Sequence, residues 1–255
     1  MKKQIPNLFT LMNLLFGCLS VVSSMQHGVS IQYDADGVQY LDIPEEIFWA
    51  SFYIGLAAIF DFFDGFVARW LDATSDMGKQ LDSLSDVVSF GVAPAMIMYQ
   101  FLRLSLSSGE NGLNLPMVYL IPAFLLALAA AYRLARFNLT SSSFVGFEGL
   151  PSPAAGIFIA SFPLIYWQSN AYQFAGLLIK SWFNYAIILL VSFLMISKLK
   201  LFSLKVKKGP LSAHIHLIIL LLLSVVTSLF FQWLAIPITF VGYIVLSLLF
   251  KNKIS

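Results

Sequence analysis

The sequence predicts an all-α membrane protein, a polytopic bundle of about eight transmembrane helices that forms a single domain over residues 1–255. Hydrophobic residues make up 59% of the chain and charged residues only 11%, whereas a soluble domain usually carries about 25% charged residues. Long charge-free runs recur along the chain. The basic residues gather in segments that would lie on one side of a membrane. These observations exclude an ordinary soluble domain.

The first three spans follow from the length of the apolar runs. A spanning helix needs about 20 mostly apolar residues, and such runs occupy residues 5–25, 47–70 and 78–102. The basic start, MKKQIPNLF, is not followed by a small-residue cleavage site, so we interpret the first run as a retained span and not as a removed signal peptide. A polar, acid-bearing loop, HGVSIQYDADGVQYLDIPEE, separates the first two spans.

The remaining spans lie in the second half of the chain. Residues 116–137, 151–167 and 182–197 provide the fourth, fifth and sixth spans. From residue 209 to residue 250 the chain has no Asp, Glu, Lys or Arg, which leaves room for two more spans divided near QWLAIP. We interpret residues 171–180, between the fifth and sixth spans, as a segment that lies at the membrane interface.

The orientation follows from the basic residues near the ends of the spans. With the N-terminus inside, eight spans return both termini to the cytoplasm, and 13 of the 15 Lys and Arg residues then lie inside. Only Arg103 and Lys180 fall outside. The inside set is Lys2, Lys3, Arg69, Lys79, Arg133, Arg136, Lys198, Lys200, Lys205, Lys207, Lys208, Lys251 and Lys253. This asymmetry supports the span count and puts residues 61–86 at the cytoplasmic face.

Six of the thirteen acidic residues lie within residues 61–86, in DFFDGFVARWLDATSDMGKQLDSLSD. On the second span, residues spaced by three and four share one helical face: Asp61, Asp64, Gly65, Ala68 and Arg69. On the third span a second such face carries Gly78, Asp82, Asp86 and Ser89. Because the linker between the spans is short, we expect the two helices to be antiparallel neighbours whose carboxylates face one another across a cleft.

Four carboxylates that face one another in apolar surroundings predict a divalent cation. Without compensation their burial would be very costly. Hard oxygen ligands suit Mg²⁺, Mn²⁺ or Ca²⁺, and Mg²⁺ typically binds carboxylates together with substrate phosphates. The small residues on the same faces leave room for a flat ligand. We interpret the two remaining acids of this stretch, Asp72 and Asp76, as solvated residues at helix ends.

The eight spaced residues Asp61-x2-Asp64-Gly65-x2-Ala68-Arg69-x8-Gly78-x3-Asp82-x3-Asp86 resemble, without a gap, the signature of the CDP-alcohol phosphatidyltransferases. The resemblance implies a Mg²⁺ or Mn²⁺ site formed by Asp61, Asp64, Asp82 and Asp86. It also implies that Asp86 is the catalytic base that deprotonates the alcohol. The implied nucleotide-binding residues are Gly65, Ala68, Arg69 and Gly78. The catalytic core would span about residues 1–200, followed by two additional spans at about 211–250.

Further stretches are similar to the phosphatidylserine synthase branch of that family: IPNLFTLMNLLFG, LDSLSDVVSFGVAPA, YRLARFN and GLPSPAAG. This likeness implies a reaction between CDP-diacylglycerol and L-serine that yields phosphatidylserine and CMP. The implied location is a bacterial cytoplasmic membrane, with membrane lipid and the two substrates as partners. The likeness is compatible with a homodimer, and no nucleic-acid partner is expected.

The acceptor site implied by this likeness needs a cation for the carboxylate of serine. Arg133 and Arg136 lie three residues apart at the cytoplasmic end of the fourth span, and Asn138 follows them. The two arginines are equally explained as topological anchors. Asn7, Thr10 and Asn13 share one face of the first span, where they either satisfy helix contacts or line the cleft.

Two alternatives stay open at this stage. The first is the same reaction class with another alcohol acceptor, glycerol phosphate or inositol phosphate, although a phosphorylated acceptor would favour a denser basic pocket. The second is a cation transporter that uses the acids as its ion site. Transporter sites usually lie near the bilayer midplane and between internal repeats, whereas these acids lie toward the cytoplasmic ends of their spans and no repeat is visible in the sequence.

Overall fold

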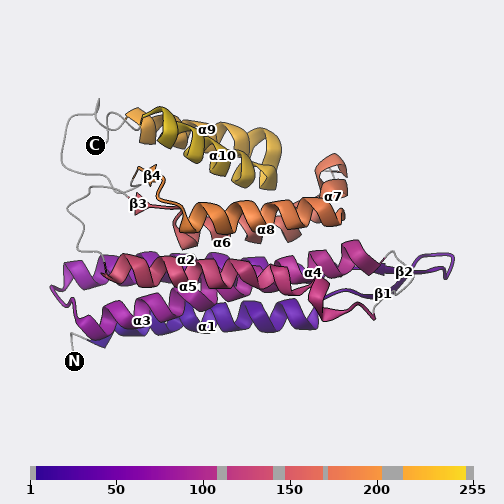
Figure 1. Ribbon diagram of the computed structural model, residues 1–255, viewed down its shortest axis with the longest axis horizontal. Coiled ribbons are helices and arrows are strands. Elements are labelled where there is room, and N and C mark those ends of the chain that lie inside the picture. Colours follow the sequence, from indigo (N-terminus) through magenta and orange to yellow (C-terminus); the bar gives the residue numbers. More distant parts are fainter. Residues whose placement is uncertain (1–3, 108–113, 140–146, 169–171, 203–214, 251–255) are drawn as a thin grey trace.

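The computed structural model describes residues 4–107, 114–139, 147–168, 172–202 and 215–250. Helices dominate this part of the chain, and the predicted all-α bundle is confirmed (Figure 1). The basic residues expected at the two termini and in the loop before residue 215 lie outside the described residues; they are Lys2, Lys3, Lys205, Lys207, Lys208, Lys251 and Lys253.

The first half of the chain forms the lowest of three tiers in Figure 1. Helix α1 spans Ile5–Gln26 and α2 spans Phe48–Trp70, after a single helical turn at Glu45–Ile47. The third predicted span is one long helical run made of α3 (Asp76–Val87), a π-helical turn η3 (Val88–Val92) and α4 (Ala93–Ser107). Two short 3₁₀ turns, Met117–Tyr119 and Ile121–Phe124, lead into α5 (Leu125–Leu139).

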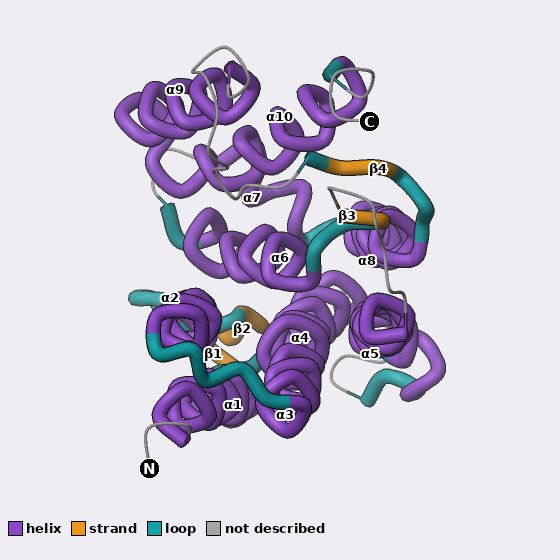
Figure 2. The backbone as a smooth tube through the Cα atoms, turned by 90° about the vertical axis from the view of Figure 1, so that its left-hand side faces the viewer, coloured by secondary structure: helices purple, strands orange, loops and turns teal. Residues whose placement is uncertain are grey.

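The second half of the chain forms the other two tiers. Helices α6 (Ser152–Tyr166), α7 (Tyr172–Leu178) and α8 (Ser181–Ile196) make the middle tier. Helices α9 (Ile215–Phe231) and α10 (Ala235–Leu249) make the upper tier (Figures 1 and 2). Ring stacking joins these two tiers, because Phe158 of α6 and Phe240 of α10 lie with ring centroids 4.2 Å apart.

Five helical runs of the described residues are long and apolar enough to cross a membrane. The fifth, Ile215–Leu249, bends at a 3₁₀ turn, Gln232–Leu234, where Gln232 has a φ of 50°, and so becomes the pair α9 and α10. With the shorter apolar helices α6 and α8, the described residues contain eight apolar segments, in agreement with the predicted count. Helix α1 begins and α10 ends at the same end of the bundle (Figure 1).

The core of the bundle surrounds α4, which lies between its neighbours in Figure 2. Ile97, Met98, Phe101 and Leu102 of this helix are fully buried. The outer helices instead expose large apolar side chains, among them Phe62 of α2, a pattern typical of a surface that contacts lipid. The long α3–α4 run is therefore the central element on which the other helices pack.

The loop between the first two spans contains a β-hairpin that the sequence analysis did not predict. Strands β1 (Ser30–Tyr33) and β2 (Gln39–Asp42) pair antiparallel, with Ser30 opposite Asp42 and Tyr33 opposite Gln39. The hairpin projects from the end of the bundle opposite the N-terminal end of α1 (Figure 1). A second pair of short strands, β3 (Phe147–Glu148) and β4 (Lys200–Leu201), joins the chain before α6 to the chain after α8.

Candidate active site

Three of the four predicted carboxylates meet between α2 and α3. Each of Asp61, Asp64 and Asp82 offers an oxygen, and these oxygens all lie within 4.8 Å of one another. The two helices are joined by the short turn after Trp70, which reverses the chain so that the acidic faces oppose each other as their spacing predicts. Asp64 is buried, and Asp61 and Asp82 are half-buried.

Asp86 lies one turn deeper along α3 and is also buried. Its carboxyl group is close enough to that of Asp61 to share a hydrogen bond, and Asp61 also lies within hydrogen-bonding reach of Asp82. The four acids therefore form one continuous cluster. Three of them converge on one point, and Asp86 extends the cluster toward the interior of the bundle.

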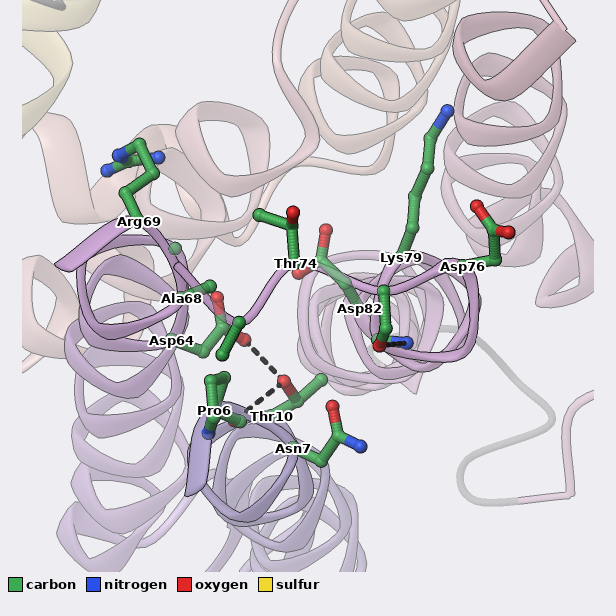
Figure 3. Close-up of a pocket in the computed structure, with 14 residues that line it drawn as sticks. Pro6, Asn7, Thr10, Asp64, Ala68, Arg69, Thr74, Asp76, Lys79 and Asp82 are labelled. Atoms are coloured by element: carbon green, nitrogen blue, oxygen red, sulfur yellow. Dashed lines mark hydrogen bonds between the residues drawn. The ribbon is translucent and has the colours of Figure 1, made fainter. Parts of the chain in front are cut away.

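Helix α1 holds two of the acids by hydrogen bonds. The Thr10 hydroxyl donates to Asp64 Oδ2 at 2.8 Å, as the dashed line in Figure 3 marks, and Asn13 Nδ2 donates to Asp86 Oδ1 at 3.2 Å. These bonds show that the polar face of the first span both makes helix contacts and contributes to the site, since Asn7 and Thr10 also line the cleft.

Two further hydrogen bonds dock α1 onto the α3–η3 run. Ser85 Oγ donates to the backbone oxygen of Thr10 at 3.1 Å, and Ser89 Oγ donates to that of Asn13 at 2.9 Å. Gly17, one turn further along α1, lets the two backbones approach closely, because a Cβ at that position would collide with Ser89. The α1 side chains that bond the carboxylates are thus carried by a helix packed in close backbone contact.

An open cleft of about 550 Å³ lies beside the carboxylates (Figure 3). Ser75 caps α3 at its edge by accepting a hydrogen bond from the Gly78 backbone N–H at 3.0 Å. Arg69 and Lys79 extend from α2 and α3 around the cleft (Figure 3). Its lining comprises Pro6, Asn7, Thr10, Asp64, Gly65, Ala68, Arg69, Ala73, Thr74, Ser75, Asp76, Gly78, Lys79 and Asp82. All four residues predicted to contact a nucleotide are in this set.

The donor set of the cluster fits a hard divalent cation. Three carboxylates converge, and two of them, Asp64 and Asp82, border the cleft. Mg²⁺ is commonly bound by one or two carboxylates together with substrate phosphates. Such a site can hold a cation between the acids and a phosphorylated ligand in the cleft.

The three predicted acceptor residues have different surroundings. Arg133 is 5% exposed, donates from Nη1 to Ser152 Oγ at 3.0 Å and interacts electrostatically with Asp86.

The other two residues join α5 to neighbouring helices. The Arg136 guanidinium donates to backbone oxygens at the end of α8, those of Ile196 at 2.7 Å and Ser197 at 3.1 Å. Asn138 Nδ2 donates to Ser83 Oγ at 2.8 Å, which joins α5 to α3. Of the three, Arg133 is the residue whose charge interacts with an acid of the cluster.

Two features of the site were missed by the sequence analysis. Ser152, the partner of Arg133, begins α6 directly after Pro151, and the pattern Pro-Ser-Pro at a helix start was the available signal. The π-helical turn η3 directly follows α3 and precedes Pro94. In a regular helix the ring of Pro94 would clash with the backbone oxygen of Phe90, and the wider turn accommodates it.

The bundle and its cleft define a multi-pass membrane protein with a carboxylate site suited to a cation and a phosphorylated ligand. The sequence profile of the CDP-alcohol phosphatidyltransferases matches residues 3–186. The chain belongs to this family.

Individual relatives agree with that assignment. A CDP-diacylglycerol–serine O-phosphatidyltransferase of Bacillus subtilis (strain 168) is 32% identical over 153 residues, 60% of this chain and 71% of that protein. The Helicobacter pylori (strain ATCC 700392 / 26695) protein of the same name is 30% identical over 227 residues, 88% of this chain and 82% of that protein. An archaetidylserine synthase of Methanothermobacter thermautotrophicus is 31% identical over 162 residues, 63% of this chain and 58% of that protein.

Proposed function

We propose that the protein transfers the phosphatidyl group of CDP-diacylglycerol to L-serine and so produces phosphatidylserine and CMP. The observation that carries this proposal is the convergence of the family signature on one cleft, with three carboxylate oxygens within 4.8 Å of one another beside a space of about 550 Å³. The names of the bacterial relatives support serine as the acceptor. The name of the archaeal relative supports the same head group on a different lipid.

The donor would bind with its pyrophosphate beside the acids and its cytidine against the small residues of α2 and α3. Gly65, Ala68 and Gly78 keep the cleft open, and Arg69 and Lys79 carry positive charge around it. Asp61, Asp64 and Asp82 would hold the cation, with Asp86 as a further ligand. A bound Mg²⁺ or Mn²⁺ would neutralise phosphate charge and stabilise the charge that develops on the leaving group.

The reaction exchanges one phosphorus–oxygen bond for another. The serine hydroxyl oxygen attacks the phosphorus that bears the diacylglycerol, the bond from that phosphorus to CMP breaks, and CMP leaves with the bonding electron pair. The hydroxyl proton passes to the Asp86 carboxylate. General base catalysis of this kind typically contributes about 10²–10⁴-fold, and the position of Asp86 beyond the three converging acids supports its assignment as the base.

The proposed location is the cytoplasmic membrane of a bacterium, with the cleft on the cytoplasmic side. The distribution of Lys and Arg supports this orientation, since 13 of 15 fall on the side of the cleft if eight spans are assumed. The acyl chains of the donor would then remain in the inner leaflet. A homodimer would be compatible with this arrangement.

CMP release from the purified protein tests the proposal. We expect release only when CDP-diacylglycerol, L-serine and Mg²⁺ or Mn²⁺ are all present, and we expect a chelator to stop it. Glycerol 3-phosphate and inositol phosphate should not replace serine. CMP release with one of these alcohols, and none with serine, would assign the chain to another branch of the reaction class. Cation uptake into vesicles without CMP release would favour a transporter.

A pair of aspartate variants completes this test. Asp64→Asn removes a proposed cation ligand. Losing a group that only orients a metal ligand typically costs about 10–100-fold, so we expect the loss of turnover in Asp64→Asn to be larger than that. Asp72→Asn is the matched control, because Asp72 is an exposed acid at the end of the same helix with a φ of 50°, a conformation that asparagine tolerates. The control should retain activity. Equal activity in both variants would contradict the cation assignment.

A further inference from the structure

Two buried side chains that interact with Asp86 each have a polar atom, one an acceptor and one a donor, without a hydrogen-bond partner among the described residues. One is the amide oxygen Oδ1 of Asn13, and the other is the guanidinium nitrogen Nε of Arg133. A buried polar atom without a partner costs free energy comparable to a lost hydrogen bond. On side chains that interact with a candidate catalytic group, such atoms are available to bond a ligand.

Asn13 is held in a fixed position and is fully buried. Its Nδ2 donates to Asp86 Oδ1 at 3.2 Å, and its backbone oxygen accepts from Ser89 Oγ at 2.9 Å. The Nδ2 atom of Asn13 already donates to Asp86, the proposed base. The Oδ1 atom of the same amide group is therefore available as an acceptor. That acceptor suits a ligand that carries hydrogen-bond donors.

Arg133 of α5 is held by a hydrogen bond to α6. Its Nη1 donates to Ser152 Oγ, a fully buried hydroxyl at the start of α6. The guanidinium interacts electrostatically with Asp86, and Nε has no partner in the described part of the chain. A charged donor in this position suits a ligand carboxylate.

We propose that Asn13 and Arg133 together recognise the acceptor as a zwitterionic amino acid. Arg133 Nε donates to the α-carboxylate, and Asn13 Oδ1 accepts from the α-ammonium. Both groups of serine are attached to the carbon that bears its hydroxymethyl arm, so the two contacts present the hydroxyl to Asp86. This inference rests on the proposed function and names the residues that make the acceptor site specific for an amino acid.

The other predicted acceptor residues do not meet these conditions. The Arg136 guanidinium is bonded to backbone oxygens of Ile196 and Ser197, and the Asn138 amide is bonded to Ser83. Their hydrogen bonds join α5 to neighbouring elements. The structure therefore distinguishes Arg133 from Arg136, although the two lie three residues apart on one helix.

A crossed specificity experiment tests the proposal. CMP release is measured with L-serine, with ethanolamine, which lacks the carboxylate, and with L-glycerate, which has the configuration of L-serine and carries a hydroxyl in place of the ammonium group. The preference for serine is the ratio of the KM of the other acceptor to the KM of serine. Where an acceptor gives no measurable turnover, its inhibition constant in competition with serine is used in place of its KM. Arg133→Gln should reduce the preference for serine over ethanolamine about tenfold or more, and Asn13→Ala should similarly reduce the preference for serine over L-glycerate.

Each substitution should leave the other preference unchanged, because serine and L-glycerate both carry the carboxylate in the same configuration, while serine and ethanolamine both carry the ammonium group. A structural role for either residue would instead lower activity with all three acceptors by the same factor. That uniform loss would overturn the proposal. The KM for CDP-diacylglycerol should stay near the wild-type value in both variants.

Matched controls come from the same side-chain types. Asn184 is fully buried and has an unpartnered Oδ1 among the described residues, but its amide bonds the backbone oxygens of Phe101 and Leu178. Asn184→Ala and Arg136→Gln should leave both preference ratios at the wild-type values. Thermal unfolding in detergent checks that each variant is folded.

A lysine variant covers the case in which Arg133→Gln does not fold. Arg133→Lys keeps the charge but lacks Nε, and it should raise the KM for serine with little change in the KM for the donor. An unchanged KM for serine would overturn the role of Nε. Failure of the proposed function looks different, because the wild-type protein would then release no CMP with serine.

Discussion

At the scale of single residues, the site depends on hydrogen bonds that orient carboxylates before any ligand arrives. Asp64 and Asp86 are both buried, and each accepts a bond from α1, from Thr10 and Asn13 respectively. A hydrogen bond to an ionised group is roughly twice as strong as one between neutral groups. The bonds therefore favour the charged carboxylates that a cation site requires and fix their directions.

Replacing Thr10 tests this orienting role. Thr10→Val keeps the shape of the side chain but removes the hydroxyl that donates to Asp64 Oδ2. We expect the Mn²⁺ concentration for half-maximal CMP release to rise about tenfold, at the lower end of the about 10–100-fold range for groups that orient metal ligands. Titration of activity with Mn²⁺ at saturating substrates measures this change.

Thr227 provides the control for that experiment. It is a buried threonine of α9 whose hydroxyl donates within its own helix, to the backbone oxygen of Leu223 at 2.7 Å. Thr227→Val should leave the Mn²⁺ dependence unchanged. If Thr10→Val also leaves it unchanged, the bond to Asp64 has no part in cation binding.

At the scale of elements, the contact between α1 and the turn η3 connects the packing of the bundle to the site. Ser89 of η3 donates to the backbone of α1, and Gly17 lets the two backbones approach closely. Small residues at such positions are a general way to pack membrane helices. Because Asn13 lies one turn before Gly17 and bonds Asp86, the spacing of these elements sets the geometry of the proposed base.

A methyl group at Gly17 should therefore disturb both stability and turnover. In Gly17→Ala the new Cβ would lie 2.9 Å from the Cα of Ser89, so the two elements must move apart. We expect overpacking to lower the free energy of unfolding by about 1–3 kcal/mol, together with a lower kcat. Thermal unfolding in detergent and CMP release measure the two effects.

Gly55 is the matched glycine for this comparison. It lies within α2, and a Cβ added there would meet no atom within 4 Å. Gly55→Ala should keep activity and should stabilise the helix slightly, by about 0.5–1 kcal/mol at most. A Gly17→Ala protein as stable and active as Gly55→Ala would show that the close contact is unimportant.

At the scale of the whole molecule, the site lies at one end of the bundle and the β1–β2 hairpin lies at the other (Figure 1). The family profile ends at residue 186, before α9 and α10, which pack on the outer side of α6. We propose that the catalytic core lies within about residues 1–200 and that the last two helices, within about residues 211–250, are an addition to it. The two ends of the bundle would face opposite sides of the membrane.

Cysteine labelling in intact cells tests this orientation. Cys18 is the single cysteine of the chain, so Cys18→Ala provides a background without thiols. In that background Val38→Cys marks the hairpin end, and Met77→Cys marks the cleft end; the native side chains are 60% and 64% exposed. A membrane-impermeant maleimide should label the cysteine at position 38 in intact cells and the one at position 77 only after permeabilisation. The reverse pattern would place the cleft outside.

Patterns in the sequence were enough to predict the helical class, the approximate spans and the acidic faces of α2 and α3. These properties are local: an apolar run must be long enough to cross a bilayer, and residues three and four apart share a helical face whatever surrounds them. The spacing of Asp61, Asp64, Asp82 and Asp86 was therefore sufficient to predict that the carboxylates of two neighbouring helices meet.

Which other side chains join these carboxylates depends on how the helices pack and could not be predicted from local patterns. Asn13 and Asp86 are 73 residues apart, and Arg133 is separated from both, so no local pattern distinguishes Arg133 from Arg136 or pairs Asn13 with a carboxylate. The hairpin at β1 and β2 and the turn η3 were not predicted for a related reason, since neither follows the periodicity of a regular helix. Contacts between distant segments depend on how the helices pack, and that packing follows from the shapes of all their faces together.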